Sequence, residues 1–530
     1  MQRYSGSDEC LKRATEWVRD CLDHHKLCRT EKRAGLPSRV IDLGTDSAIR
    51  PRLMNISAAV TAYVALSYCW GEDETSTTTT ENILTHMTDI RFTSLPKAYQ
   101  DLMVIARALK VRYVWIDALC IIQDDAQDWA REASKMCSVY ENAYITVSAD
   151  CSPGTHYGIF SEQSYATPTS VLCYMGSAVN VRESLQRKHT LHDPFDNIDY
   201  DNLDAPVPLF RRAWCLQETV LSTRALHFTG KELMWECNES YKCECQNQKM
   251  GTPDMSNRAF RRPEILGHAT KAEFFDKWQA LLEAYTARDL RKESDKFAAI
   301  SGLAKKMQQV IRYFTGADDV YLAGLWKSNL AQDLLWQRQI EFFHTEPARG
   351  RPREWRAPSW SWASINGPVN QNHSMNLASQ IELIDYECIT LSDDTTGQIQ
   401  SAWITVRGRV VSVNVEREAV HGSSRERDRL EGFKYRVRRV GGREAYGFIP
   451  DEHAACFDGA GEYFCLHVAN REERDFSHQL FVALRKSFSD GEAFERVGVS
   501  DREDAWDFIG YRKQAERLFD TAQEQTIKLV

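Results

Sequence analysis

Three apolar runs, separated by two amphipathic segments, constrain the fold of the first half of this chain more than any other feature. The runs are YVALSYCW at 63–70, RYVWIDALCII at 112–122 and YITVSA at 144–149. Each run has the length of one buried strand, and the apolar residues between the runs recur at helical spacing. Strands that alternate with helices are typical of a parallel sheet with right-handed crossover connections. We therefore predict an α/β domain built on a parallel sheet.

The segments around these runs carry the signals of helices. Residues 97–110 follow Pro96 and place their apolar side chains on one face, which predicts a helix. Asp125 is a suitable N-cap for a second helix over 126–143. A further helix is predicted at 10–28, followed by a short strand at 39–44, and residues 211–228 begin as a helix and end as a strand.

The chain is too long for one ordinary hydrophobic core, because 530 residues correspond to two or more domains. We predict four regions: an N-terminal helix and strand packing on the core (1–50), an α/β domain (60–237) with an insertion (151–208), a mainly helical region (238–350), and a mixed, β-rich region (351–530). In the last region, alternating stretches such as WITVRGRVVSVNV indicate strands.

Two further features of the β-rich region are interpreted from their residue types. Trp360 and Trp362 alternate in PSWSWAS, which predicts a strand with both rings on one face packed against the N-terminal domain. The charged segment at 416–444 is predicted to be a loop.

Composition excludes several classes of protein. The net charge of −9 argues against a nucleic-acid-binding surface, and no apolar run approaches the roughly 18 residues of a membrane span. The first residues show no basic segment followed by an apolar one, so no secretory signal is expected. The 15 cysteines have no framework spacing, which favours reduced thiols and a cytoplasmic location.

Several long motifs resemble a known family. YVALSYCWG at 63–71, the blocks at 95–125 and 128–149, and RAWCLQETVLSTRALHF at 212–228 resemble, in order and spacing, the signature blocks of the fungal heterokaryon incompatibility (HET) domain. Segments that resemble those commonly following this domain are DKFAAISGLA at 295–304, YLAGLW at 321–326 and APSWSWAS at 357–364.

The resemblance implies a role in fungal non-self recognition and programmed cell death. HET domains are also held to be distantly similar to TIR domains, which have a flavodoxin-like parallel sheet and some of which cleave NAD at the nicotinamide–ribose bond. The fold implied is therefore a flavodoxin/TIR-like parallel sheet, with a helical middle and a β-rich C-terminal region behind it. NAD would be a substrate, and no cofactor is expected.

Glu218 is the candidate catalytic residue that this resemblance implies. Trp214, Cys215 and Glu218 match the order of a Trp-Cys-x-x-Glu-like element whose glutamate is essential in catalytic TIR domains. Cleavage of the glycosidic bond of NAD builds positive charge on the ribose, and a nearby carboxylate stabilises that charge. The structural alternative is that Glu218 caps its helix or forms an ion pair within it.

The other candidate site residues follow the predicted strands, where open α/β sheets bind ligands. Ser67, Tyr68, Trp70 and Gly71 follow the first strand, and Asp117 lies near the end of the second. Tyr68 and Trp70 are candidates for stacking on a nicotinamide or adenine ring, with a place in the core as the alternative. Asp117 is either a ligand-binding carboxylate or a structural acceptor of hydrogen bonds from a neighbouring loop.

The third block adds two substrate-binding candidates. Trp214 belongs to the motif of Glu218, and Arg212, flanked by Arg211 and followed by Arg224, is a candidate for holding a pyrophosphate. No glycine-rich nucleotide motif follows any of the three strands, so a Rossmann or P-loop mode is not supported.

A metal site is not expected, although Cys21, His24, His25 and Cys28 share one face of the predicted helix. One helix supplies four ligands with poor tetrahedral geometry, and no second pair of ligands is evident in the sequence. A buried seam of Cys and His side chains is the interpretation. A nucleophilic cysteine among Cys69, Cys120 and Cys215 is a weaker alternative for catalysis.

Two classes of function follow. The first is an enzyme, an NAD nucleosidase that hydrolyses an N-glycosyl bond and thereby triggers cell death. The second is a non-catalytic HET adaptor that signals by association with itself or with another incompatibility protein. Glu218 discriminates between them, because only the enzyme needs its carboxylate.

Overall fold

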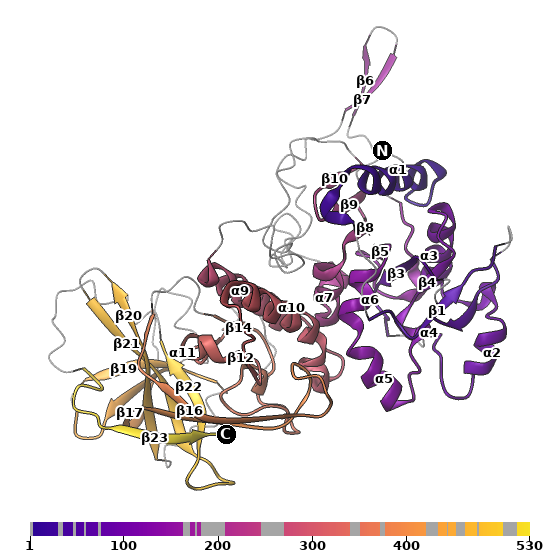
Figure 1. Cartoon of the computed structure of the whole chain (residues 1–530). Helices are drawn as coiled ribbons and strands as arrows, with labels where there is room; N and C mark the ends of the chain where they lie inside the picture. Colours follow the sequence, from indigo (N-terminus) through magenta and orange to yellow (C-terminus); the bar gives the residue numbers. More distant parts are fainter. Residues whose placement is uncertain are drawn as a thin grey trace. The chain divides into compact units, whose positions relative to one another are not determined.

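The computed structural model of the chain describes two compact units (Figure 1). Unit 1 comprises Met1–His268 with Ala299–Val310, and unit 2 comprises Ala269–Ala298 with Ile311–Val530. The residues described are 4–29, 35–45, 49–57, 60–72, 76–162, 170–174, 177–181, 207–244, 270–339, 350–371, 377–419, 433–442, 444–451, 462–473, 476–501 and 517–530. Most of the predicted insertion at 151–208 and the middle of the charged segment at 416–444 lie outside them.

Unit 1 is built on a sheet of eight described strands in the order β10-β9-β8-β5-β3-β4-β1-β2. The four central strands, β8, β5, β3 and β4, are parallel, which confirms the predicted α/β class. Antiparallel strands extend the sheet at both edges. The strands are β1 (Arg39–Asp42), β2 (Arg52–Asn55), β3 (Tyr63–Ser67), β4 (Tyr113–Trp115), β5 (Ile145–Ser148), β8 (Arg224–Phe228), β9 (Leu233–Cys237) and β10 (Tyr241–Cys243).

Helices connect the parallel strands and cover both faces of the sheet. The helices and helical turns of this unit are α1 (Asp8–His24), η1 (Lys26–Cys28), α2 (Ile83–Thr88), η2 (Phe92–Ser94), α3 (Lys97–Ala108), α4 (Asp117–Cys120), α5 (Ala126–Ala133), α6 (Met136–Asn142), η3 (Thr155–Tyr157), η5 (Pro208–Arg211) and α7 (Ala213–Leu221). A hairpin of β6 (Ser170–Tyr174) and β7 (Ser177–Val181) lies within the predicted insertion. Because β4 and β5 lie on opposite sides of β3, right-handed crossovers place α3 on one face and α5 to α7 on the other.

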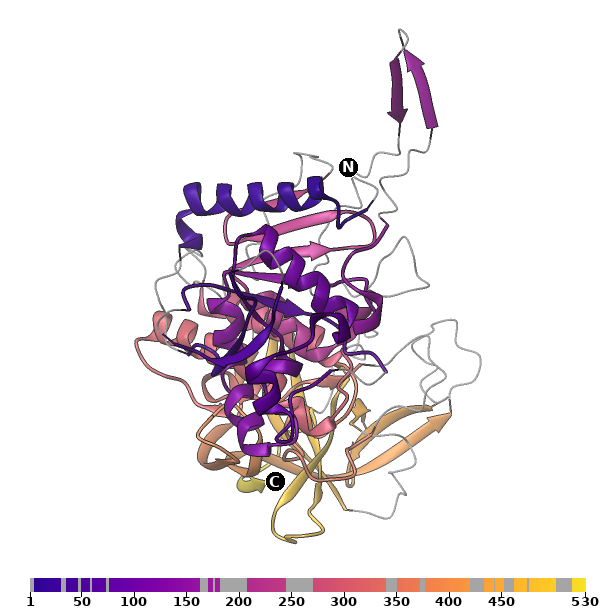
Figure 2. The ribbon, with the colours of Figure 1, turned by 90° about the vertical axis from the view of Figure 1, so that its right-hand side faces the viewer.

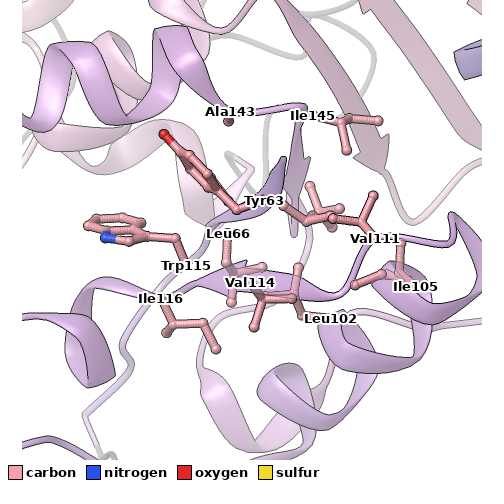
Figure 3. Packing of buried hydrophobic residues seen from close by; sticks show 14 of the residues in the cluster. Tyr63, Leu66, Leu102, Ile105, Val111, Val114, Trp115, Ile116, Ala143 and Ile145 are labelled. Carbon is pink, nitrogen blue, oxygen red and sulfur yellow. The ribbon is translucent and has the colours of Figure 1, made fainter. Parts of the chain in front are cut away.

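Alternate side chains of the central strands pack against helices on the two faces of the sheet. Leu102 and Ile105 of α3 point toward Val114 of β4 (Figure 3), and all three are fully buried. On the opposite face the Tyr63 hydroxyl donates a hydrogen bond to the Val139 carbonyl of α6 at 2.5 Å. Side chains of a strand point to alternate faces, so Ser67, four residues after Tyr63, lies on the same α6–α7 face.

Several predicted elements of unit 1 are shorter than their sequence pattern indicates, and two of them show why. The apolar run at 112–122 forms a strand only over β4, because the Asp117 carboxylate accepts the backbone N–H of Ala118 at 2.7 Å and begins a helical turn. The helix predicted at 126–143 is divided into α5 and α6 by a turn at Ser134 and Lys135. Its predicted cap is confirmed, since the Asp125 side chain accepts hydrogen bonds from the backbone N–H groups of two residues in the first turn.

Unit 2 combines helices with a large and mainly antiparallel sheet. Its strands β16 (Glu382–Thr390), β17 (Ile399–Ala419), β18 (Phe433–Arg439), β19 (Ala445–Pro450), β20 (Tyr463–Glu473), β21 (Phe476–Lys486) and β22 (Phe494–Ser500) form this sheet with β15 (Leu377–Ser379) and β23 (Glu524–Leu529). The remaining elements are α9 (Lys271–Thr286), η7 (Glu293–Lys296), α10 (Ala298–Thr315, shared with unit 1), β11 (Tyr321–Leu322), β12 (Leu325–Trp326), η8 (Lys327–Asn329), α11 (Leu330–Asp333), β13 (Gln337–Arg338), η9 (Trp362–Ser364) and β14 (Val369–Asn370). The predicted β-rich C-terminal region is thus confirmed.

Two expectations for this region were wrong. Trp360 and Trp362 lie in a turn and the helical turn η9, not in a strand, and both rings are buried within unit 2. Their indole N–H groups donate to the backbone carbonyls of Leu529 and Gly324, both of which belong to unit 2. The charged segment at 416–444 is not one loop, because residues 416–419 belong to β17 and Phe433–Arg439 form β18.

No helix within the described ranges is long and apolar enough to cross a membrane.

Candidate functional site

The candidate residues lie at the carboxyl ends of the central strands of unit 1. Counted along the chain, β3, β4, β5 and β8 have the spatial order 2-1-3-4, which is the start of the flavodoxin-like order. In such sheets the order in which strands are added reverses between the first and third strands. Ligands bind at this point, outside the carboxyl ends of the strands. The loops after β3 and β5 flank this position.

Ser67 and Glu218 meet on the α6–α7 face of the sheet. Ser67 is the last residue of β3, and Glu218 lies in α7, which crosses between β5 and β8. The Ser67 hydroxyl donates a hydrogen bond to Glu218 Oε2 at 2.5 Å, and the Cys215 thiol, one turn earlier, also bonds to this carboxyl group. Both Ser67 and Glu218 are buried, with exposed fractions of 1% and 4%.

The buried position of Glu218 changes its acidity. Burial raises the pKa of its carboxyl group to about 7, although the Arg212 guanidinium and the Ser67 hydroxyl act in the opposite direction. The nearby Asp117 carboxylate adds to the increase. A carboxyl group with a pKa near neutrality can exchange a proton at physiological pH, as acid–base groups in enzymes do.

Asp117 joins the aromatic residues that follow β3. Its two carboxylate oxygens accept hydrogen bonds from the Tyr68 hydroxyl at 2.7 Å and the Trp70 indole N–H at 2.9 Å. The Tyr68 hydroxyl also lies 2.8 Å from that of Tyr99 in α3. These bonds fix Asp117 as an acceptor for the neighbouring loop, in line with the structural alternative for this residue. Tyr68 is buried in the core, whereas Trp70 is half-buried and can present part of its ring.

Arg212 is committed to the same loop. Its guanidinium donates to the Tyr68 carbonyl and lies among the charged or ionisable groups of Asp117, Cys215 and Glu218. Arg224, by contrast, lies on β8 and binds Cys21 and the carbonyl of Cys28. The structure therefore brings Arg212, but not Arg224, to the candidate site.

Gly71 allows two loops to approach at the proposed switch point. It has a φ of +83°, and a Cβ atom added to it would lie 3.0 Å from the Cα atom of Gly154, in the loop after β5. The backbone conformation and the close contact both require glycine. The role of Gly71 in the described structure is thus to bring the loops after β3 and β5 together.

We expect Gly71→Ala to lower the free energy of unfolding of unit 1 by about 2 to 3 kcal/mol, because it adds left-handed strain and a backbone clash. Gly44→Ala is the matched control, since Gly44 has a φ of +75° with open space around its Cβ position. The control should lose only the strain, about 1 to 2 kcal/mol. Urea unfolding followed by tryptophan fluorescence measures both, and equal losses would show that the loops are not in contact.

The site is surrounded by a pair of tryptophan rings and by buried cysteine thiols. Trp214 is half-buried and packs edge-on against Trp129 of α5, with ring centroids 6.3 Å apart. Cys69 and Cys215 form a small buried cluster with Leu209. Burial raises the pKa of Cys69 to about 11 and that of Cys120 to about 12, so neither thiol is activated as a nucleophile.

The Cys/His seam at the end of α1 has a different composition from the one expected. Ligand atoms of Cys21, His25, Cys28 and Cys237 all lie within 4.8 Å of one another. His24 is not among them, because its ring bonds to Asp20 and faces solvent. Sequence reasoning missed Cys237, since 209 positions separate it from Cys28 and no local spacing links the two. The cluster lies near the end of β9, the strand next to the edge strand β10, where Figures 1 and 2 show α1 beside β9 and β10.

One model of a protein family matches the segment that contains the central strands β3, β4 and β5. Residues 63–218 match the model described as heterokaryon incompatibility protein (HET). This segment is similar to the HET domain. Every candidate site residue from Ser67 to Glu218 lies within it, whereas the Cys/His cluster lies outside it on both sides. Comparisons with the curated proteins and with the solved structures gave no match.

Proposed function

We propose that this chain is a signalling protein of fungal non-self recognition and programmed cell death whose HET domain hydrolyses the N-glycosyl bond of NAD. The observation that carries the proposal is the contact between Ser67 and Glu218 at the carboxyl edge of the parallel sheet, with a carboxyl pKa of about 7. The expected location of this activity is the cytoplasm, and the expected partner is a second copy or another incompatibility protein.

The chemistry needs one carboxylate and one water molecule. The bond between the pyridinium nitrogen of nicotinamide and the ribose breaks, and nicotinamide leaves as a neutral pyridine with the bonding electron pair. Ionised Glu218 stabilises the oxocarbenium-like ribose, and its bond to Ser67 fixes the carboxylate orientation. Water adds to the ribose carbon and releases one proton, so the products are ADP-ribose, nicotinamide and a proton.

The residues around Glu218 have separate roles in this proposal. Trp70 and Trp214 are half-buried and offer aromatic surfaces for the nicotinamide or adenine ring. Asp117 holds the Trp70 indole in place, and Arg212 holds the loop after β3 through the Tyr68 carbonyl. Because Glu218 is only 4% exposed, the groups that enclose it must move before a ribose can reach it.

A non-catalytic HET adaptor is the second candidate, and the burial of Glu218 favours it. The carboxyl group is enclosed, and Ser67, Cys215 and Arg212 already satisfy it. In this case the cluster stabilises the crossover between β5 and β8, and the domain signals by self-association or by binding a partner. The residues around Glu218 then stabilise the fold and do not contact a substrate.

Nicotinamide release from NAD by the purified full-length chain tests the proposal. We expect Glu218→Gln to reduce turnover by on the order of a hundredfold or more, because glutamine cannot carry the negative charge. The matched control is Glu132→Gln, since Glu132 of α5 is also buried and accepts a serine hydroxyl at 2.5 Å, from Ser38. Turnover by the native protein should rise about tenfold from pH 6 to pH 8, as Glu218 ionises around its pKa of about 7.

The outcome decides between the two candidates. Equal loss of turnover in Glu218→Gln and Glu132→Gln would assign the effect to folding alone. If the folded native chain releases no nicotinamide in either its monomeric or its assembled form, as judged by light scattering, the enzyme is excluded. Cell death that persists with Glu218→Gln would then support the adaptor.

A further inference from the structure

Four potential metal ligands converge where α1 and the end of β9 meet in unit 1. Cys21 lies in the last turns of α1, His25 follows the end of this helix, and Cys28 ends the turn η1. Because the chain leaves helical geometry after His24, these three side chains are not restricted to one helix face. Cys237 approaches from the end of β9 and supplies the fourth ligand atom.

The distances between these atoms suit a small tetrahedral ion. A tetrahedral Zn²⁺ with sulfur at about 2.3 Å and nitrogen at about 2.0 Å separates its ligand atoms by roughly 3.5 to 3.8 Å. All four atoms already lie within 4.8 Å of one another, and His25 Nδ1 lies 3.2 Å from the Cys237 sulfur. The thiols of Cys21 and Cys28 also lie within hydrogen-bonding reach of that sulfur. Only small side-chain shifts separate this arrangement from a coordinated one.

The surrounding charge independently points to thiolates at this position. Arg224 is 3% exposed, and its guanidinium donates to the Cys21 sulfur at 3.3 Å and to the carbonyls of Cys28 and Tyr144. A buried guanidinium needs a compensating negative charge. Three thiolates with one divalent cation carry a net charge of −1, which the arginine balances. Hydrogen bonds of this kind from outside the ligand set are typical of metal centres.

The loops that hold the ligands are also tied to each other. The backbone N–H of Leu27 donates to the Glu239 carboxylate, and the Asn238 side chain donates to the Leu27 carbonyl at 3.0 Å. The backbone N–H of Glu239 bonds to the Cys237 sulfur. The turn after β9 and the turn η1 are thus fixed against each other before any ion binds.

We propose that Cys21, His25, Cys28 and Cys237 bind one structural Zn²⁺ that joins the end of α1 to β9. Three sulfurs and one imidazole nitrogen in a tetrahedral arrangement favour zinc among the common metals. Four protein ligands leave no open position, so the site is structural and not catalytic. The three cysteines are buried and His25 is partly exposed, which leaves a route by which the ion enters.

Metal analysis of the full-length chain tests this assignment. We expect about one zinc per chain after purification without added metal, and a loss of about tenfold or more in zinc content for Cys237→Ser and His25→Ala. The matched controls should keep their zinc. They are Cys243→Ser, a buried cysteine on the neighbouring strand β10, and His24→Ala, the adjacent histidine that bonds to Asp20.

A second measurement protects the test against variants that fail to fold. The native chain refolded with Co²⁺ should show the intense visible absorption of a tetrahedral cobalt–thiolate site, and zinc should abolish it. A folded native chain without stoichiometric zinc or cobalt absorption would overturn the proposal. So would a disulfide between two of the three cysteines, iron or copper in place of zinc, or equal zinc loss in His24→Ala and His25→Ala.

Discussion

Replacing Arg496 with methionine should lower the free energy of unfolding of unit 2 by about 3 to 5 kcal/mol, because it breaks a buried ion pair and leaves one charge unpaired. Arg496 of β22 is fully buried and bonds to Asp451 at 3.0 Å and to the carbonyls of Leu334 and Trp336. Its guanidinium also lies 3.6 Å from the centre of the Trp336 ring. Methionine keeps an unbranched apolar stem but makes none of these bonds.

Urea unfolding compares this variant with Arg407→Met on the same sheet. Arg407 pairs with Glu382 at the same distance of 3.0 Å, but both side chains are about half exposed or more. The exposed pair should contribute less than about 1 kcal/mol. Adding Asp451→Leu to Arg496→Met should recover part of the loss, since no unpaired carboxylate then remains. Similar losses in the buried and exposed variants would contradict the packing described for Arg496.

The free energy of unfolding of unit 1 should depend less on pH in Glu218→Gln than in the native protein. The difference should be about 3 kcal/mol between pH 4.5 and pH 8. Burial raises the pKa of this carboxyl group from 4.5 to about 7, so the folded chain holds the proton more tightly than the unfolded chain. The stability from this proton is present below pH 4.5 and is lost as pH rises through 7. Glutamine has no such proton, and the variant should gain stability relative to the native protein at high pH.

Chemical unfolding at several pH values measures this difference directly. Asp333 of unit 2, whose pKa burial also raises to about 7, titrates equally in both proteins and cancels from the comparison. Glu16→Gln, on the exposed side of α1, serves as a surface control and should change stability by less than about 0.5 kcal/mol at any pH. A constant difference between Glu218→Gln and the native protein across the range would mean that the carboxyl group ionises normally.

The sequence was sufficient to predict the centre of unit 1. The apolar runs predicted at 63–70 and 144–149 contain β3 and β5, and the segment at 211–228 begins as the helix α7 and ends as the strand β8, as predicted. The pattern of apolar residues along the chain is enough to locate these elements, because it follows their burial. The same pattern predicted that Ser67 and the loop after β3 lie at the carboxyl edge of the sheet. Their contact with Glu218 depends on which face each residue occupies, and the two-residue alternation of β3 determines this.

Other features depend on contacts that leave no local pattern. Asp117 ends β4 early through a hydrogen bond to its neighbour, within a run whose composition still favours a strand. Arg212 is predicted to hold a pyrophosphate, and no local pattern indicates that its guanidinium also donates to the Tyr68 carbonyl. The meeting of Cys28 with Cys237 brings together two segments far apart in the chain, and no spacing rule connects them.

The strands of the matched segment are only part of the sheet that they form. Residues 63–218 contain β3, β4 and β5, whereas β1 covers the outer edge of β4 and β8 covers that of β5. A fragment trimmed to the limits of the family match would therefore expose the backbone N–H and C=O groups of two apolar strands at once. Such open edges pair with other chains. Fragments cut at these limits should aggregate on expression, and a loss of activity in them would say nothing about the site itself.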